Sequence, residues 1–577
     1  MSNSANPGKT AATESSSSDP SAWLNKLFQA GWGSAGGPQA AAGDADLAAA
    51  LSTAMRQVAE LQKEYLDQVT RLWGGMWGWT GPAEGEGQAR EDRRFSAEAW
   101  SRDPRFDALR RTYIACSDAL QRAVELAPLD EKSKLQLSFT ARQFSEAMSP
   151  SNFFATNPEA IELAIQTGGR SVVEGTALFL EDLGKGRVTM SDESAFAVGR
   201  NLAVTEGAVV FENDLMQLIQ YTPRTADVHA RPLLLVPPCI NKFYILDLQP
   251  ENSLVRYAVE QGHTVFLVSW RNIKPELGHL TWDDYLQLGV FRAIDIAKEI
   301  ARSDRINVLG FCVGGTLLAS ALALMAQSGE DKVSSLTLLT TLLDFSDGGE
   351  IGHLITEDSV AQRERAIGGG GILPGRELAT VFSSLRANDL IWQYVSNGYL
   401  KGKAPPAFDM LYWNSDATNL PGPMFCWYVR NTYLENKLRI PGKTMLCGAP
   451  VDLSSITVPA YLYASREDHI VPWRGAFASR RLLGGETTFT LGASGHIAGV
   501  INAPAKKKRN YWTGGAGTDA EKWLESAASV PGSWWPHWSE WLARHAGPRV
   551  ARPASLGSRK YRPTEPAPGR YVMEKDA

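Results

Sequence analysis

The stretch INVLGFCVGGTLLASALALMA (306–326) decides the fold of the larger part of this chain. It begins with a short apolar run typical of a buried β-strand and ends with an apolar helix. Between the two, GFCVGG (310–315) matches the nucleophile-elbow pattern G-x-S-x-G, with Cys in place of Ser. Such a turn is tight, so a side chain at Gly310 or Gly314 would collide with a neighbouring strand or helix. The pattern predicts that Cys312 is a nucleophile.

The position of Cys312 also suits this chemistry. It would lie at the N-terminus of the following helix, where the helix dipole and free N–H groups favour a thiolate. The whole stretch 306–326 lacks charged residues and is long enough to cross a bilayer. It has internal glycines but neither Lys/Arg flanks nor aromatic belts, which favours a buried strand, turn and helix over a membrane span.

Further apolar runs alternate with helical segments on both sides of this stretch. The runs expected to form strands are LLLVPP (233–238), TVFLVSW (264–270), INVLGFC (306–312), LTLLTTLLDF (336–345), PAYLYAS (459–465) and TTFTLG (487–492). Nearly continuous apolar runs are typical of parallel strands covered on both faces. A helix is expected over 282–302, with Thr281 and Asp284 as a capping box. The alternation predicts a doubly wound sheet, and with the elbow an α/β-hydrolase fold.

A cysteine nucleophile in this fold needs a general base and an acid that follow it in the chain. His496, in GASGHIAG (492–499), comes directly after the last core strand and is the predicted base. His469 is the second candidate, but it comes one strand earlier. Asp468 follows the preceding strand and is the predicted acid, with Asp344 as the alternative. The order Cys312, Asp468, His496 is the order of this fold.

An oxyanion hole requires two backbone N–H groups. The first is expected from Val313, directly after the nucleophile. The second is expected from the loop after the strand LLLVPP, in the region of Ile240. Cys239 lies beside this proposed site, and a packing role is favoured for it over a catalytic one.

The chain divides into three predicted parts. Residues 1–85 are expected to form an interaction segment that begins disordered and continues as an amphipathic helix. The helical pattern covers 46–79, and its apolar face either packs on its own domain or docks on a partner or apolar surface. Residues 86–200 are expected to form a helical N-terminal domain. Residues 201–577 are the predicted α/β-hydrolase domain, with an inserted cap at about 346–445, because a connection this long must carry its own structure or function. That segment could also form a second small core.

Composition excludes several function classes. The formal net charge is -5, which argues against nucleic acid as the main partner. The 5 cysteines form no CxxC pair and no Cys/His cluster typical of zinc, so no metal site is expected. The first residues lack the apolar region of a secretory signal, and free thiols suit a reducing cytoplasm.

A thiol nucleophile indicates a preference for thioester substrates. Attack by a thiolate on a thioester exchanges one thioester for another, so the acyl group stays activated. A waiting hydroxyl can then take the acyl group to form an oxoester, and a capped site that excludes water would favour this transfer over hydrolysis. The motif alone does not separate transfer from hydrolysis.

Beyond these motifs, most of the chain after residue 80 resembles the class I polyhydroxyalkanoate synthases. The segments that carry the resemblance are DRRFSAEAW (92–100), SPSNFFATNPEA (149–160), PPCINKFYILDLQPENS (237–253), VSWRN (268–272), GFCVGGT (310–316), YWNSDATNLP (412–421), SREDHIVPW (465–473), GASGHIAGVINAPAKKKR (492–509) and EPAPGRYV (565–572). It implies polymerisation of (R)-3-hydroxyacyl-CoA, with Cys312 acylated, His496 as base and Asp468 also activating the incoming 3-hydroxyl. Trp413 matches a family tryptophan connected with dimerisation and activity.

The same resemblance implies further properties. GFCVGGT is similar to the form with short-chain preference, which favours 3-hydroxybutyryl-CoA, and CoA enters only as part of the substrate. No separate cofactor is expected, since this substrate carries its own activating group. The family implies a cytoplasmic homodimer on polyester granules, with residues 1–85 available to granule-associated proteins. Two alternatives remain: a Cys-type thioesterase or intracellular depolymerase with the same triad, and an inactive granule-coating protein.

Overall fold

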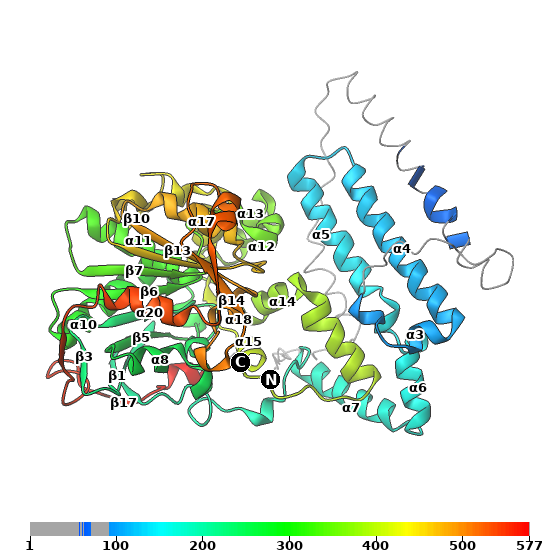
Figure 1. The fold of residues 1–577 in the computed structure, drawn as a ribbon, viewed down its shortest axis with the longest axis horizontal. Helices are drawn as coiled ribbons and strands as arrows, with labels where there is room; N and C mark the ends of the chain where they lie inside the picture. Colours follow the sequence, from blue (N-terminus) through cyan, green and yellow to red (C-terminus); the bar gives the residue numbers. More distant parts are fainter. Residues whose placement is uncertain (1–56, 58–59, 62, 68, 71–91, 576–577) are drawn as a thin grey trace, which may run out of the picture.

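A computed structural model describes residues 57, 60–61, 63–67, 69–70 and 92–575 of the chain. Most of the helix expected over 46–79 therefore lies outside the described residues, as do residues 1–45; the described positions within 46–79 are helical. Figure 1 shows a large sheet covered by helices, with a group of helices from the N-terminal part of the chain beside it.

Among the described residues, eleven strands form one sheet in the order β15-β14-β13-β12-β7-β6-β4-β5-β2-β1-β17. Its centre is parallel and consists of β4 (Leu233–Val236), β5 (Val265–Trp270), β6 (Ile306–Phe311), β7 (Val333–Leu339), β12 (Ala460–Ser465) and β13 (Thr487–Gly492). Five of these six strands lie within runs expected from the sequence, which confirms the parallel centre. The run 336–345 was placed too late in the chain: β7 begins at Val333 and ends at Leu339, and 340–345 form no strand.

Helices bury both faces of the sheet, which explains why its central strands are mostly apolar. One core packs α10 (Arg292–Ala301), α11 (Val313–Gln327) and α17 (Trp473–Ser479) against the sheet. The other core uses α8 (Leu254–Glu260), α18 (His496–Val500) and α20 (Trp535–Ala543). The predicted capping box at Thr281 and Asp284 is present at α9 (Trp282–Asp284).

The sheet extends beyond the predicted strands at both edges. The added strands are antiparallel: β1 (Gly207–Glu212), β2 (Met216–Tyr221) and β17 (Glu565–Pro566) on one side, β14 (Asn510–Thr513) and β15 (Ala528–Pro531) on the other. Short pairs also form between β3 (Asp227–His229) and β16 (Arg549–Ala551), β8 (Ile372–Leu373) and β9 (Leu420–Pro421), and β10 (Met445–Leu446) and β11 (Ala449–Pro450).

The long connection between β7 and β12 is mainly helical. Its helices are α12 (Gly349–Leu354), α13 (Glu357–Ile367), α14 (Gly375–Leu385), α15 (Asp409–Asn414) and α16 (Gly422–Val429), followed by a π-helical turn, η11 (Arg430–Leu434). We refer to these helices and their loops as the cap. Within the cap, Arg430 of η11 forms ion pairs with Glu364 of α13 and with Glu435.

The N-terminal helices pack against the cap rather than against the sheet (Figure 1). They are α3 (Ala99–Arg102), α4 (Pro104–Leu126), α5 (Glu131–Ala147), α6 (Pro158–Gln166) and α7 (Arg170–Lys185). Arg142 of α5 pairs with Glu350 of α12 at 2.7 Å, and Gln143 donates to the Ser384 carbonyl at 2.6 Å.

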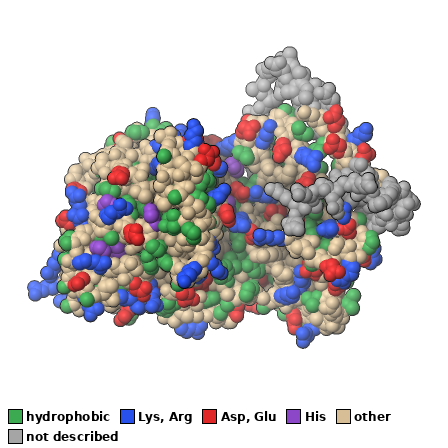
Figure 2. Space-filling model, in the orientation of Figure 1, with side chains coloured by type: hydrophobic (Ala, Val, Ile, Leu, Met, Phe, Trp, Pro, Cys, Tyr) green, Lys and Arg blue, Asp and Glu red, His purple; other side chains and the backbone are tan. Residues whose placement is uncertain are grey.

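Two sequence expectations concern the surface charge and the lack of a membrane span. Acidic and basic side chains are interspersed over the face drawn in Figure 2. Within the described ranges, each helix is too short or too polar to cross a bilayer.

Candidate active site

Cys312 occupies the turn between β6 and α11, as the elbow pattern predicts. Its backbone has φ 53° and ψ -127°, a conformation that side-chain-bearing residues rarely adopt. Its N–H donates to the Leu339 carbonyl at 3.0 Å, and Thr341 Oγ1 donates to its carbonyl at 3.2 Å. These bonds to the neighbouring strand hold the strained turn in place.

Glycines make this turn possible. A Cβ on Gly310 would collide with the backbone of Gly315, and one on Gly314 would collide with the carbonyls of Val236 and Pro237. The steric requirement inferred from the sequence is therefore present in the structure. It brings α11 close to β4 and directs the Cys312 side chain from the end of β6.

Asp468 and His496 follow β12 and β13, so both lie at the same carboxyl edge of the sheet as Cys312. Nδ1 of His496 lies 2.7 Å from Oδ2 of Asp468. Oδ1 of Asp468 accepts the N–H groups of Ile470 and Val471 at 2.9 and 2.8 Å. Both triad partners are buried, each with 7% of its surface exposed. Three bonds thus fix the carboxylate toward the imidazole.

His496 also lies near Cys312, because negative charge on the sulfur is among the causes that raise the pKa of the ring, so the structure brings all three predicted residues together. Since Nδ1 faces Asp468, Nε2 is the nitrogen left for the sulfur. Burial lowers the pKa of His496, but the charges of Asp468 and Cys312 and the hydrogen bond to Asp468 outweigh burial and raise it to about 10. A cationic imidazolium in this position stabilises negative charge on the sulfur.

The alternative residues have other partners. Asp344 accepts hydrogen bonds from Asn436 at 2.9 Å and Ser346 at 2.7 Å, and pairs with Arg439 at 3.3 Å. His469 is close to the triad, but burial lowers its pKa, and the Asp468 carboxylate is hydrogen-bonded to Nδ1 of His496 rather than to His469. The geometry therefore favours Asp468 and His496; their catalytic roles remain predictions.

The two predicted oxyanion donors lie in the elbow itself and in the loop after β4. Val313 is the first residue of α11, a position whose N–H has no acceptor within its own helix. Ile240 lies in the loop after β4, and its carbonyl accepts the Thr418 N–H of the cap at 2.8 Å. Cys239 is 1% exposed, and burial raises its pKa to about 12, so it stays protonated at neutral pH.

Sequence reasoning missed two tyrosines of the cap. Tyr428 of α16 and Tyr433 of η11 are partly buried, and negative charge on Cys312 is among the causes that raise their pKa, after burial. The Tyr428 ring stacks on Trp282 with centroids 5.3 Å apart. Their spacing carries no motif, because the long cap connection brings them to the sulfur only after folding.

Trp413 of α15 is buried, with 4% of its surface exposed. Its indole N–H donates to the carbonyl of Lys242 at 2.7 Å. This tryptophan, which the resemblance connects with dimerisation and activity, therefore contacts the loop that contains Ile240.

Comparison with known proteins identifies families and structures that this chain resembles. A family model described as "Poly-beta-hydroxybutyrate polymerase (PhaC) N-terminus" matches residues 91–258, and one described as "alpha/beta hydrolase fold" matches 232–503. The solved structure of Paleococcus ferrophilus monoacylglycerol lipase is similar at a TM-score of 0.34 and 15% identity, over 57% of this chain and 99% of the lipase.

Curated relatives extend the match over most of the chain. The poly(3-hydroxyalkanoate) polymerase subunit PhaC of Cupriavidus necator is 51% identical, over 96% of this chain and 95% of the relative. The corresponding subunit of Rhizobium meliloti is 42% identical over 84% and 80%. Poly(3-hydroxyalkanoate) polymerase 1 of Ectopseudomonas oleovorans is 39% identical over 84% and 87%. The chain belongs to the poly(3-hydroxyalkanoate) polymerase family, as its motifs predicted.

Proposed function

We propose that this protein is an acyltransferase that polymerises (R)-3-hydroxyacyl-CoA into polyhydroxyalkanoate and releases CoA. The observation that carries the proposal is the 51% identity to the Cupriavidus necator polymerase subunit over 96% of this chain. The neighbouring side chains of Cys312, His496 and Asp468 supply groups suited to the chemistry.

In the first step, the Cys312 thiolate attacks the thioester carbonyl of the substrate. The N–H groups of Val313 and the Ile240 region stabilise the oxyanion that forms. The carbon–sulfur bond to CoA then breaks, and His496 delivers its proton to the departing CoA sulfur. The products are an acyl group on Cys312, free CoA and a neutral imidazole that Asp468 still orients.

In the second step, the 3-hydroxyl of another acyl unit attacks the Cys312 thioester. Neutral His496, supported by the Asp468 carboxylate, accepts the hydroxyl proton. The new bond is an oxoester, and the sulfur leaves as a thiolate beside the restored imidazolium. Each cycle therefore returns the ion pair with which it began and lengthens the chain by one unit.

The closed surroundings of Cys312 favour an alcohol over water as the acceptor. His496 and Asp468 are buried, and Tyr428 and Tyr433 of the cap are close enough for charge on the sulfur to affect their pKa. Excluding bulk water protects a reactive acyl-enzyme from hydrolysis. The cap thus supports transfer rather than thioesterase activity.

Several finer properties belong to the same proposal. GFCVGGT (310–316) supports short-chain substrates, with 3-hydroxybutyryl-CoA favoured. The family resemblance supports a homodimer in the cytoplasm at the surface of polyester granules, with residues 1–85 available to granule-associated proteins. The reaction as written needs no cofactor or metal, since the thioester itself supplies the activation.

Substrate profiling tests the proposal. Purified protein is given CoA esters of (R)-3-hydroxy acids with chains of about three to eight carbons, and CoA release is followed together with chloroform-soluble polymer. We expect polymer with every CoA-releasing substrate and the highest rate with the four-carbon unit. Free hydroxy acid without polymer would instead identify a thioesterase or depolymerase.

A further inference from the structure

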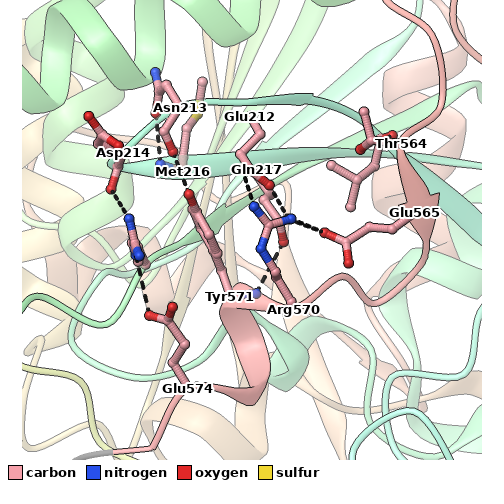
Figure 3. Close-up of polar contacts among 12 residues, drawn as sticks. Glu212, Asn213, Asp214, Met216, Gln217, Thr564, Glu565, Arg570, Tyr571 and Glu574 are labelled. Carbon is pink, nitrogen blue, oxygen red and sulfur yellow. Dashed lines mark hydrogen bonds and ion pairs between the residues drawn. The ribbon is translucent and has the colours of Figure 1, made fainter.

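The C-terminal segment 564–575, here called the tail, returns to the catalytic domain and is fixed there. Its strand β17 pairs with β1 at the edge of the sheet. Arg570 forms ion pairs with Glu565 at 2.9 Å and with Glu212 of β1, as Figure 3 shows. The Tyr571 hydroxyl donates to the Asn213 carbonyl at 2.8 Å, and its N–H donates to Gln217 at 3.2 Å. These contacts set the path of the last residues.

Beyond Tyr571, the tail meets a buried lysine. The Nζ of Lys242 donates to the carbonyl oxygen of Glu574 at 2.6 Å, and Lys242 is 2% exposed. The carboxylate of Glu574, labelled in Figure 3, pairs with Arg271 at 3.4 Å and Lys274 at 3.6 Å. A buried ammonium is stable only when it is hydrogen-bonded, so Lys242 ties its own loop to the tail.

That loop is the one expected to supply the second oxyanion N–H. Lys242 lies two residues after Ile240, in the connection between β4 and the short helix Phe243–Leu246. Two other bonds of the loop go to residues 413–418, here called the base of the cap: the Ile240 carbonyl accepts from Thr418 at 2.8 Å, and the Lys242 carbonyl accepts from Trp413 at 2.7 Å. The loop is therefore held between the base of the cap and the tail.

The tail also contacts the base of the cap directly. Lys575 pairs with Asp416 at 3.0 Å, and the same carboxylate oxygen accepts the Tyr244 hydroxyl at 2.9 Å. Asp416 lies between Trp413 and Thr418, the two residues that bond to the loop. Consecutive tail residues, Glu574 and Lys575, thus contact the loop and its support.

We propose that Lys242 is a positioning residue for acyl transfer: through Glu574 and Lys575 the tail holds the loop at Ile240 where its N–H meets the developing oxyanion. This inference rests on the proposed function, because it needs an acyl transfer at Cys312. An oxyanion donor stabilises the transition state only at hydrogen-bonding distance, so a small displacement of this loop slows the reaction without removing any group that touches the substrate.

The test separates two reactions of the same sulfur. Acylation of Cys312 by (R)-3-hydroxybutyryl-CoA requires the oxyanion hole, whereas alkylation by iodoacetamide does not. We expect Lys242→Met to slow single-turnover acylation about 10- to 100-fold, with KM changed less than about 3-fold. The rate of Cys312 alkylation, resolved from the other cysteines by peptide mass spectrometry, should stay at the wild-type value.

Two further variants complete the test. The Lys575 side chain is 60% exposed. Lys575→Met should slow acylation by a smaller factor and leave alkylation unchanged, and it serves as the test if Lys242→Met does not fold. Lys560→Met removes an exposed ion pair with Glu299, made by a residue outside the tail, and should leave both rates unchanged. Wild-type acylation in Lys242→Met and Lys575→Met, or an equal fall of alkylation and acylation, would overturn the inference. Failure of the wild type to acylate at Cys312 would instead contradict the proposed function.

Discussion

Oδ2 of Asp468 lies 2.7 Å from Nδ1 of His496, and the opposite oxygen of the same carboxylate is held by two backbone N–H groups. The carboxylate is therefore oriented before any substrate binds. It fixes the plane and the tautomer of the imidazole, which turns Nε2 toward Cys312. The acid–base chemistry of the proposed reaction depends on this one contact.

Replacing His496 with Gln should prevent acylation. The amide keeps a polar side chain of similar size but can neither stabilise the thiolate as a cation nor deliver a proton to CoA. We expect the first-turnover release of CoA to fall by at least about 100-fold. Consumption of the substrate at a normal rate would show that His496 is not the base.

Replacing Asp468 with Asn should harm elongation more than acylation. In the variant, negative charge on Cys312 still favours the imidazolium that gives its proton to departing CoA, whereas the incoming hydroxyl needs a base strengthened by the missing carboxylate. Quenched-flow measurement of the first CoA released gives acylation, and the later rate of polymer formation gives elongation. An equal loss of both rates would refute the second role of Asp468.

The raised pKa of His496 makes a prediction about stability. The folded protein holds a proton on this ring up to about pH 10, whereas an unfolded histidine loses it near the ordinary value of 6.5. Stability from this proton is therefore fully present below pH 6.5 and is lost as the pH rises toward 10.

The measurement is urea unfolding of wild type and His496→Gln at a series of pH values. Subtracting the two free energies of unfolding cancels the groups that titrate in this range without interacting with His496, and leaves the contribution of the His496–Cys312 pair. The advantage of the wild type should shrink steadily between pH 6.5 and 10. A difference that stays constant over this interval would contradict the assigned protonation state.

Features of the fold and site that depend on residues close together in the sequence could be predicted, and features that depend on distant residues could not. The elbow at Cys312 is local, since six consecutive residues contain both the nucleophile and the glycines that the turn needs. Asp468 and His496 were found because each directly follows an apolar strand, and parallel strands end at one edge. These features need only the order of the strands, not their side-chain packing.

The remaining features depend on contacts between distant residues. Strand β17 pairs with β1, although more than 350 positions separate them in the sequence. The burial of Lys242 could not be predicted either, because a lysine that follows a strand is typically expected in an exposed loop. In the structure the tail covers it. Tyr428 and Tyr433 reach the site only through the fold of the cap, whose helices carry no motif.

The glycine turn gives a prediction about folding. Gly314→Ala places a methyl group against the carbonyls of Val236 and Pro237, so we expect a loss of about 1–3 kcal/mol or more in the free energy of unfolding. Gly184→Ala is the matched control, because a Cβ there meets no atom within 4 Å and the site is an exposed turn of α7.

Thermal or urea unfolding of both variants checks this prediction. The helical control should be unchanged or more stable by about 0.5–1 kcal/mol, since alanine favours a helix over glycine. If Gly314→Ala were as stable as Gly184→Ala, the close approach of α11 to β4 would not be required for folding.

The central claim is that polyester grows from an acyl group on Cys312. The most direct measurement mixes the protein with one equivalent of (R)-3-hydroxybutyryl-CoA, quenches with acid and maps the added mass by peptide mass spectrometry, with Cys312→Ala in parallel. The account predicts one or more 3-hydroxybutyryl units on the peptide containing Cys312, and neither this adduct nor polymer in Cys312→Ala. Polymer formation by Cys312→Ala, or an adduct confined to another residue of the wild type, would contradict it.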